Sequence, residues 1–253
     1  MAKSRGSGAV KGSGGVSASA STAPKQSNRK SRQGGGGAAS APQQGGKPTI
    51  KATAMTDKEF NAAYKAQNPN QAQKSASYDY TDPRATSTGF SPSQNMNYKL
   101  DTGQRLTAKE QRMLDGMEQM QSPLAHDTVL HRGAHQNVLE ALGVKNYDRM
   151  SQTQLQKALV GREWTTKSLS STSYDKKKSP FLSGPLAGGR EVVMKINAAK
   201  GTMATRVNPS QAEVVIGRNT NWRVTGVKYT GATAYPRGTG KRLPVVELEI
   251  DVW

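Results

Sequence analysis

Two residues near the start of an apolar run could supply a catalytic carboxylate and a neighbouring amide. Gln211 and Glu213 stand two residues apart, and Glu213 directly precedes the apolar residues 214–216. Such a run predicts a buried strand, on which both side chains would point to one face. An ionised glutamate on that face is costly unless the face lines a cleft or the carboxylate meets a cationic or hydroxyl partner. The simpler interpretation is a half-exposed edge strand whose polar side chains point to water.

Partners of those kinds precede the pair along the chain. Arg132 and Gly133 end the predicted strand 127–133, and a later predicted strand ends with three hydroxyl residues, Ser171, Thr172 and Ser173. A guanidinium binds phosphate oxygens through two parallel hydrogen bonds, and glycine lets a ligand approach the backbone. Short hydroxyl side chains both donate and accept hydrogen bonds. A carboxylate in a water-poor cleft stabilises the positive charge that develops on a sugar during glycosidic bond cleavage. Each group taken alone is more often found at a surface turn or a strand edge.

The elements that must position these groups are predicted as helices first and strands later. Two pairs with capping-box spacing, Thr56 with Glu59 and Thr107 with Glu110, predict helices that run to about 65 and about 121. The polar residues 67–105 between them are predicted to be an irregular connector. The second helix carries methionines at helical spacing, which indicate core packing: Met113, Met117 and Met120.

The second half of the chain changes from helical spacing to alternation. Helices are predicted at about 134–142 and, after the cap Ser151, to about 160. Period-two patterns then predict strands at 164–172, 190–197, 202–207, 211–216, 221–229 and 243–252. Helices followed by a run of strands indicate an α+β fold and not a βαβ alternation.

Composition separates a basic tail from the rest of the chain. The net charge is +18, and residues 1–51 hold nine basic residues, no acid and almost no large apolar side chains. Such a segment cannot bury enough surface to offset its ordering entropy, so it is predicted to be a disordered arm. The arm could contact nucleic acid or an acidic surface, or serve only as a solubilising linker.

Several classes of protein and site are disfavoured by the sequence. No signal peptide and no apolar run of membrane-spanning length are present, which predicts a cytoplasmic or virion-associated protein without membrane contact. The absence of cysteine excludes disulfides and thiolate ligands, and no G-x-G-x-x-G follows a predicted strand. His126, His131 and His135 lack a carboxylate that would complete a zinc set, so no metal is expected. The three lysines at 176–178 are predicted to lie in a solvated loop, or to attract phosphate groups electrostatically.

Taken together and in this order, the three groups resemble the motifs of the arginine, serine, glutamate class of mono-ADP-ribosyltransferases, which includes the clostridial toxins. Residues 107–121, 161–164 and 200–202 resemble the segments that lead to the three motifs in that family. The resemblance covers about 105–253. It implies a mixed, mainly antiparallel core of two sheets with a central cleft for NAD. The implied domains are a tail at 1–55, a short helix and connector at 56–105, and a catalytic domain at 106–253.

The resemblance also implies a role for each site residue. Arg132 and Gly133 would hold NAD, Ser171, Thr172 and Ser173 would line its site, and Glu213 would promote cleavage of the bond between nicotinamide and ribose. Gln211 stands where arginine-modifying members have glutamate, which implies another acceptor, in a protein or a nucleic acid. Leu169, where the family tends to have an aromatic residue, and the short segment 208–210 differ from the toxins. The alternatives are an NAD glycohydrolase and a non-catalytic, phosphate-binding or virion-associated protein.

Overall fold

The computed structural model describes residues 50–84, 86–87, 89–177, 191–235 and 241–253. The predicted tail up to residue 49, Lys178, and the glycine-rich connectors at 184–189 and 238–240 lie outside the described residues. The last residues of the predicted tail differ from the prediction. Strand β1 (Thr53–Ala54) pairs in parallel with β3 (Thr128–Ala134), and Met55 is buried. The folded unit therefore includes residues that precede the first helix.

Three helices begin where their capping residues predict. They are α1 (Asp57–Ala66), α4 (Ala108–Gln119) and α6 (Gln152–Leu159), and the side chain of each N-cap accepts a hydrogen bond from the backbone N–H three residues on. These caps satisfy backbone donors that have no partner inside a helix. Helix α5 (Asn137–Ala141) is shorter than predicted, because β3 continues through Ala134.

The prediction of an irregular connector at 67–105 is wrong. This segment contains two helices, α2 (Gln71–Thr81) and α3 (Pro92–Thr102), each with a complete capping box. Pro92 occupies the first turn of α3, and Gly103 ends it with a φ of 70°. Helix α2 buries only Ala76 and Tyr80, and α3 buries only Met96. With so few apolar contacts, neither helix shows the periodic pattern by which helices are usually recognised.

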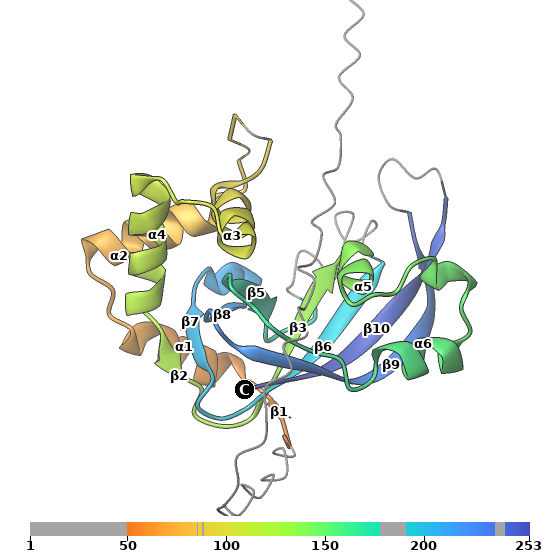
Figure 1. The fold of residues 1–253 in the computed structure, drawn as a ribbon. Coiled ribbons are helices and arrows are strands. Elements are labelled where there is room, and N and C mark those ends of the chain that lie inside the picture. Colours follow the sequence, from red (N-terminus) through yellow and green to blue (C-terminus); the bar gives the residue numbers. More distant parts are fainter. Residues whose placement is uncertain (1–49, 85, 88, 178–190, 236–240) are drawn as a thin grey trace, which may run out of the picture. The chain divides into compact units, whose positions relative to one another are not determined.

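Within the described residues, ten strands form one hydrogen-bonded network in the order β2-β7-β8-β5-β3-β6-β10-β9-β4, with β1 beside β3. Figure 1 labels all of these strands except β4. The strands other than β1 and β3 are β2 (Ser122–Pro123), β4 (Glu163–Thr165), β5 (Ser170–Ser173), β6 (Val192–Ala198), β7 (Met203–Arg206), β8 (Glu213–Ile216), β9 (Asn221–Ala234) and β10 (Leu243–Val252). The β1–β3 and β6–β10 pairs are parallel and the rest antiparallel, which confirms the mixed, mainly antiparallel α+β class. A single residue pair, His131 with Ser173, joins β3 to β5 and so links two groups of strands.

The predicted strand 164–172 is two strands, and a side chain explains the break. Asn97 of α3 donates from Nδ2 to the backbone oxygen of Leu169 at 3.0 Å, and its Oδ1 accepts from the Leu169 N–H at 3.3 Å. These two bonds occupy the backbone groups that a strand would offer to its neighbour. Leu169, directly before β5, is therefore held by a helix instead of by a neighbouring strand.

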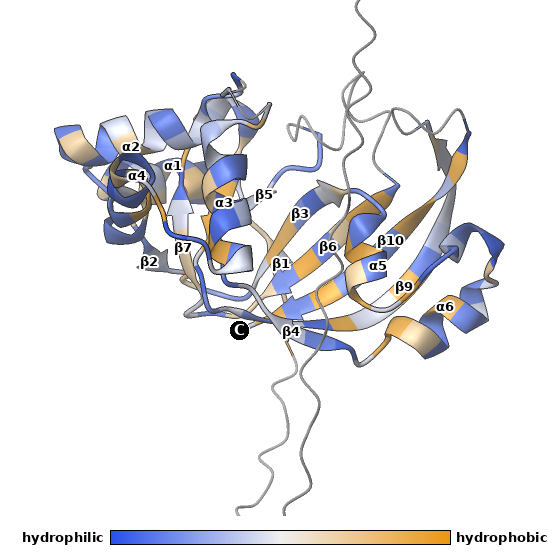
Figure 2. Cartoon of the chain, turned by 45° about the horizontal axis from the view of Figure 1, so that its top comes forward, coloured by the Kyte–Doolittle hydropathy of each residue, from blue (hydrophilic) through white to orange (hydrophobic). Residues whose placement is uncertain are grey.

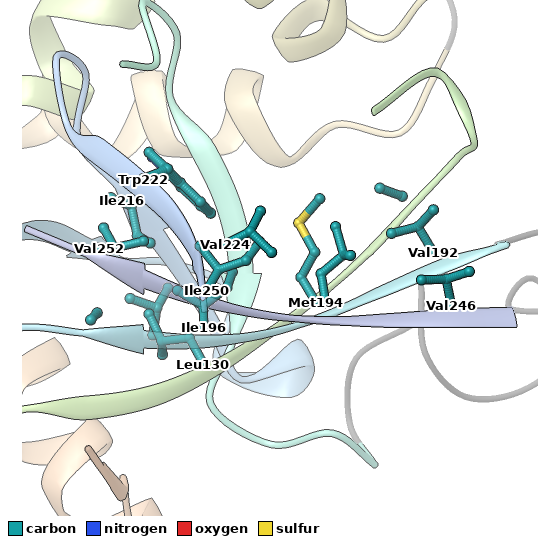
Figure 3. Close-up of a cluster of buried hydrophobic side chains, with 14 of the residues drawn as sticks. Leu130, Val192, Met194, Ile196, Ile216, Trp222, Val224, Val246, Ile250 and Val252 are labelled. Carbon is teal, nitrogen blue, oxygen red and sulfur yellow. The ribbon is translucent and has the colours of Figure 1, made fainter. Parts of the chain in front are cut away.

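Two hydrophobic clusters hold these elements together. In the larger, hydrophobic and hydrophilic residues alternate along strands such as β6 (Figure 2), and the hydrophobic ones are buried. Its members include Leu130, Met194, Ile196, Trp222 and Ile250 (Figure 3). The smaller cluster joins α2, α3 and α4 to the β5–β8 side of the network: Tyr80, Met96, Met113, Leu114, Met117, Met120, Leu169, Val207 and Val215. All three methionines predicted to pack in the core belong to it.

Helices α2 and α4 approach closely at Gly116, which gives a test of this packing. A Cβ atom placed on Gly116 would collide with the Cβ of Ala76. Gly116→Ala should therefore lower the free energy of unfolding by about 1–3 kcal/mol. In an uncrowded helix the same change would raise the free energy of unfolding by about 1 kcal/mol. The sign of the measured change therefore shows whether the two helices are in close contact at Gly116. Urea unfolding measures the effect, and Arg112→Ala, at an exposed position of α4, is the control.

Candidate active site

Arg132, Ser171 and Glu213 come from three strands that converge. Arg132 lies on β3, Ser171 on β5 and Glu213 at the first position of β8, and β5 pairs with both of the other strands. The Arg132 Nη1 donates a hydrogen bond to the backbone oxygen of Ser171 at 3.2 Å. The single β3–β5 pair lies beside this contact, so the site spans the junction between the two groups of strands.

Burial shapes the charges of this site. It raises the pKa of Glu213, against the opposing influence of the Ser171 side chain and the Arg132 guanidinium. Burial also lowers the pKa of Arg132, while Tyr80, Asp101 and Glu213 favour its charged form. Glu213 and Arg132 therefore interact where water screens them little, and a charge that developed between them would feel both strongly.

Sequence reasoning missed a tyrosine that contacts this site. Tyr80, at the end of α2, is only 2% exposed and its hydroxyl lies 2.9 Å from the Ser171 Oγ. Burial, and then the charge of Glu213, raise the pKa of Tyr80 to about 12, so its hydroxyl keeps its proton at neutral pH. The capping residues of α2 and α3 could have revealed the two helices. No sequence signal singles out Tyr80 from the exposed tyrosines Tyr78 and Tyr98 nearby.

Of the four hydroxyl residues on β5, Ser171 is the one whose side chain contacts Tyr80. The Thr172 Oγ1 donates to the backbone oxygen of Val214 at 2.6 Å, and the Ser173 Oγ donates to the backbone oxygens of Asp175 and Gln211. These bonds fix the start of β8, and thereby the position of Glu213. Gly133 follows Arg132 within β3, opposite Val193 of β6.

The prediction that one strand carries both Gln211 and Glu213 is wrong. Gln211 ends a short 3-10 helix, η3 (Pro209–Gln211), and Ala212 has a left-handed backbone with a φ of 53°. Asn208, before the 3-10 helix, is also left-handed, with a φ of 32°. Strand alternation therefore does not relate the two side chains, and Glu213 is the first residue to which it applies.

A cavity of about 360 Å³ opens beside Arg132. Its apolar wall includes Val138, Leu142, Met194 and the stacked pair Trp164 and Trp222, and its polar groups are Asp101, Thr165, Thr166, Ser168 and Ser170. A guanidinium beside an aromatic wall suits a phosphate joined to an aromatic base, and the volume is in the usual range for small-molecule sites. The residues present thus fit a nucleotide such as one half of NAD.

Two of the three histidines contact carboxylates away from this site, whereas His131 forms the β3–β5 pair with Ser173. His126 contacts Glu59, and His135 contacts the buried Glu191. Within the described ranges, no group of three or more histidine or carboxylate side chains is arranged to hold a metal ion. No helix in those ranges is long and apolar enough to cross a membrane.

The contact between Tyr80 and Ser171 gives a second test. Tyr80→Phe removes one hydroxyl and leaves the ring in the core, so the protein should lose about 0.5–1.5 kcal/mol of stability. If the hydroxyl orients Ser171 for catalysis, turnover should also fall by about 3- to 10-fold. Tyr78→Phe, two residues earlier and exposed, should change neither quantity. Full turnover in Tyr80→Phe would restrict the contact to a structural role.

The chain resembles solved ADP-ribosyltransferase toxins in fold. Plx2a, an ADP-ribosyltransferase toxin from Paenibacillus larvae, matches at a TM-score of 0.56 and 14% identity, over 78% of this chain and 94% of that one. The C3 exoenzyme of Clostridium limosum matches at 0.55 and 13%, over 81% and 98%. C3stau2 from S. aureus, solved with NAD, matches at 0.53 and 17%, over 81% and 99%.

Sequence comparison places the chain in a family. A search of curated proteins finds no match. The sequence model of the ADP-ribosyltransferase exoenzymes, however, matches residues 57–243, a range that includes α1, α2 and α3 as well as the strands of the site. Because this match spans well over half of the chain, the protein belongs to the ADP-ribosyltransferase exoenzyme family and is an NAD-dependent ADP-ribosyltransferase.

Proposed function

We propose that Arg132, Ser171 and Glu213 form the catalytic set of this enzyme, and that it transfers ADP-ribose to an acceptor group other than arginine. The observation that carries the proposal is the convergence of the three residues at the β3–β5 junction, with Arg132 hydrogen-bonded to the backbone of Ser171. Burial shifts the pKa values of both Glu213 and Arg132, and groups shifted by burial and by a specific charged partner cluster at functional sites.

Each residue has a distinct task in the proposed reaction. Arg132 pairs with the pyrophosphate of NAD, and its remaining guanidinium donors suit this role because only Nη1 contacts Ser171. The bond between the nicotinamide nitrogen and the ribose C1′ breaks, and its electron pair leaves with nicotinamide. Glu213 stabilises the positive charge left on the ribose, and the acceptor then attacks C1′ and releases its proton to water. Tyr80 and Ser171 fix the geometry of Glu213.

The proposal for the acceptor rests on the residue type at position 211. An amide pairs well with an amide or a hydroxyl, whereas a guanidinium favours a carboxylate. Gln211 precedes Glu213 by two residues, and the Ser173 hydroxyl holds its backbone oxygen at 3.1 Å. The position is thus anchored to the strand that carries Ser171. We propose a protein side chain as acceptor, with a nucleic acid drawn to the basic tail as the next candidate.

One experiment separates these acceptors. The protein is incubated with NAD labelled in the adenosine half and with a cell lysate, and the label is divided into protein, nucleic acid and free ADP-ribose. Label on protein supports the proposal, label on nucleic acid identifies the other acceptor, and label only on free ADP-ribose identifies a glycohydrolase. Absence of nicotinamide release with every acceptor would refute the proposed catalytic set.

The role of position 211 is tested by an arginine analogue. Agmatine should be a poor acceptor for the unmodified protein, and Gln211→Glu should raise ADP-ribosyl-agmatine formation by about tenfold. A carboxylate there would pair with the incoming guanidinium, while cleavage of NAD should change much less. Gln154→Glu, on α6, is the control. Efficient labelling of agmatine by the unmodified protein would show that another residue sets the acceptor.

A further inference from the structure

A carboxylate shares the cavity with Arg132, and it is not among the groups that the reaction needs. Asp101, near the end of α3, lines the same cavity of about 360 Å³. Helix α3 is fixed there by the two hydrogen bonds of Asn97 to the Leu169 backbone and by the buried Met96. The position of Asp101 is therefore set by the same contacts that shape the approach to β5.

Asp101 interacts with Arg132 only through its charge in the described part of the chain. Its side chain is exposed and makes no hydrogen bond or ion pair there. By contrast, its neighbour Lys99 is paired with Glu110 at 2.7 Å. Asp101 and Arg132 are the two charged side chains among the described residues that line the cavity. They are close enough for Asp101 to raise the pKa of Arg132.

The remaining walls of the cavity favour the half of NAD that carries the purine. Trp164 and Trp222 stack with ring centroids 5.7 Å apart, and Trp164 is half-buried at the cavity wall. A purine can pack against such an aromatic face. If Arg132 holds the pyrophosphate, the ribose next to the purine lies between the guanidinium and the aromatic wall, where Asp101 also faces the cavity.

We infer that Asp101 makes this enzyme select NAD over NADP, an inference that rests on the proposed role of Arg132. A carboxylate accepts hydrogen bonds from the 2′- and 3′-hydroxyls of a ribose, as an acidic residue does in other dinucleotide sites. NADP carries a phosphate on the 2′-oxygen. That phosphate would face Asp101 with like charge, and Arg132 would already be engaged by the pyrophosphate.

Equilibrium binding of both dinucleotides tests the inference. Calorimetry is performed with NAD and with NADP on the unmodified protein, on Asp101→Asn and on Asp115→Asn, an exposed aspartate of α4. The unmodified protein and Asp115→Asn should bind NAD at least about tenfold more tightly than NADP. In Asp101→Asn this preference should shrink to about threefold or less, because the repulsion is removed. Asp101→Lys should favour NADP.

The outcomes separate this inference from the proposed function. Equal affinity of the unmodified protein for NAD and NADP would overturn the inference. So would a preference for NAD that is the same in Asp101→Asn and Asp101→Lys as in the unmodified protein. Either result would leave catalysis by Glu213 intact. Failure of the unmodified protein to bind either dinucleotide would overturn the proposed function and the inference with it. Melting temperatures of the variants are compared first, so that a loss of fold is not mistaken for a loss of preference.

Discussion

Glu213→Gln should reduce nicotinamide release from NAD by at least about 100-fold, while the affinity for NAD changes by less than about tenfold. The amide keeps the size of the side chain and loses the negative charge that stabilises the ribose in the transition state. Burial strengthens that charge effect, since the Glu213 carboxylate is little screened by water. Single-turnover measurement of nicotinamide release, with calorimetry for binding, separates the two quantities.

The control for this prediction is Glu140→Gln, an exposed glutamate on α5. Normal turnover in Glu213→Gln would refute the proposed mechanism. An equal loss of nicotinamide release in Glu213→Gln and Glu140→Gln would indicate a general effect of removing a negative charge. A loss of NAD affinity without a loss of turnover would assign Glu213 to binding alone.

The same substitution should leave the protein at least as stable as before. Burial raises the pKa of Glu213 in the folded state above its ordinary value of 4.5. Between the unfolded and folded pKa values the native state holds a proton that the unfolded state has released, so the free energy of unfolding falls as pH rises through that window. At neutral pH the ionised Glu213 is a net cost, and Glu213→Gln should melt at the same temperature or higher. Turnover of the unmodified enzyme should fall on acidification with a midpoint above pH 4.5.

Arg132→Lys should weaken NAD binding by about 10- to 100-fold. Lysine keeps a positive charge and cannot reproduce the two parallel hydrogen bonds of a guanidinium to the pyrophosphate. Its single nitrogen would also have to replace both the Nη1 contact to the Ser171 backbone oxygen and the phosphate contact. Calorimetry with NAD measures the loss, and Arg149→Lys, exposed in the 3-10 helix η1 (Tyr147–Arg149), should bind normally. Unchanged affinity in Arg132→Lys would assign the arginine a structural role.

Local chemistry made part of this protein predictable. The capping residues Thr56, Thr107 and Ser151 specify helix starts because they satisfy backbone donors directly, whatever the rest of the chain does. Alternation of apolar residues specifies β6 and β10 because one face of each packs in the core. Arg132, Ser171 and Glu213 could be proposed as a set, since their order resembles a family.

Tertiary contacts determine the features that could not be predicted from the sequence. Helix α2 contributes Tyr80 to the site, yet its polar sequence shows only a cap and two buried side chains. The left-handed Asn208 and Ala212 shift Gln211 out of β8, and side-chain type alone does not specify such backbone angles. The two bonds from Asn97 break a predicted strand at Leu169, across 72 positions of sequence. These features depend on partners that no local pattern identifies.

The position of β10 in the sheet also bears on how the enzyme is made. This strand, residues 243–252, lies between β6 and β9, and its Leu248 is opposite Met194, which in turn is opposite Arg132. A ribosome releases residues in order, so β6 and β9 are exposed before the strand that separates them exists. Until then β6, whose Met194 lies opposite Arg132, has a strand on one side only. The sheet around Arg132 is therefore completed only after β10 has been synthesised.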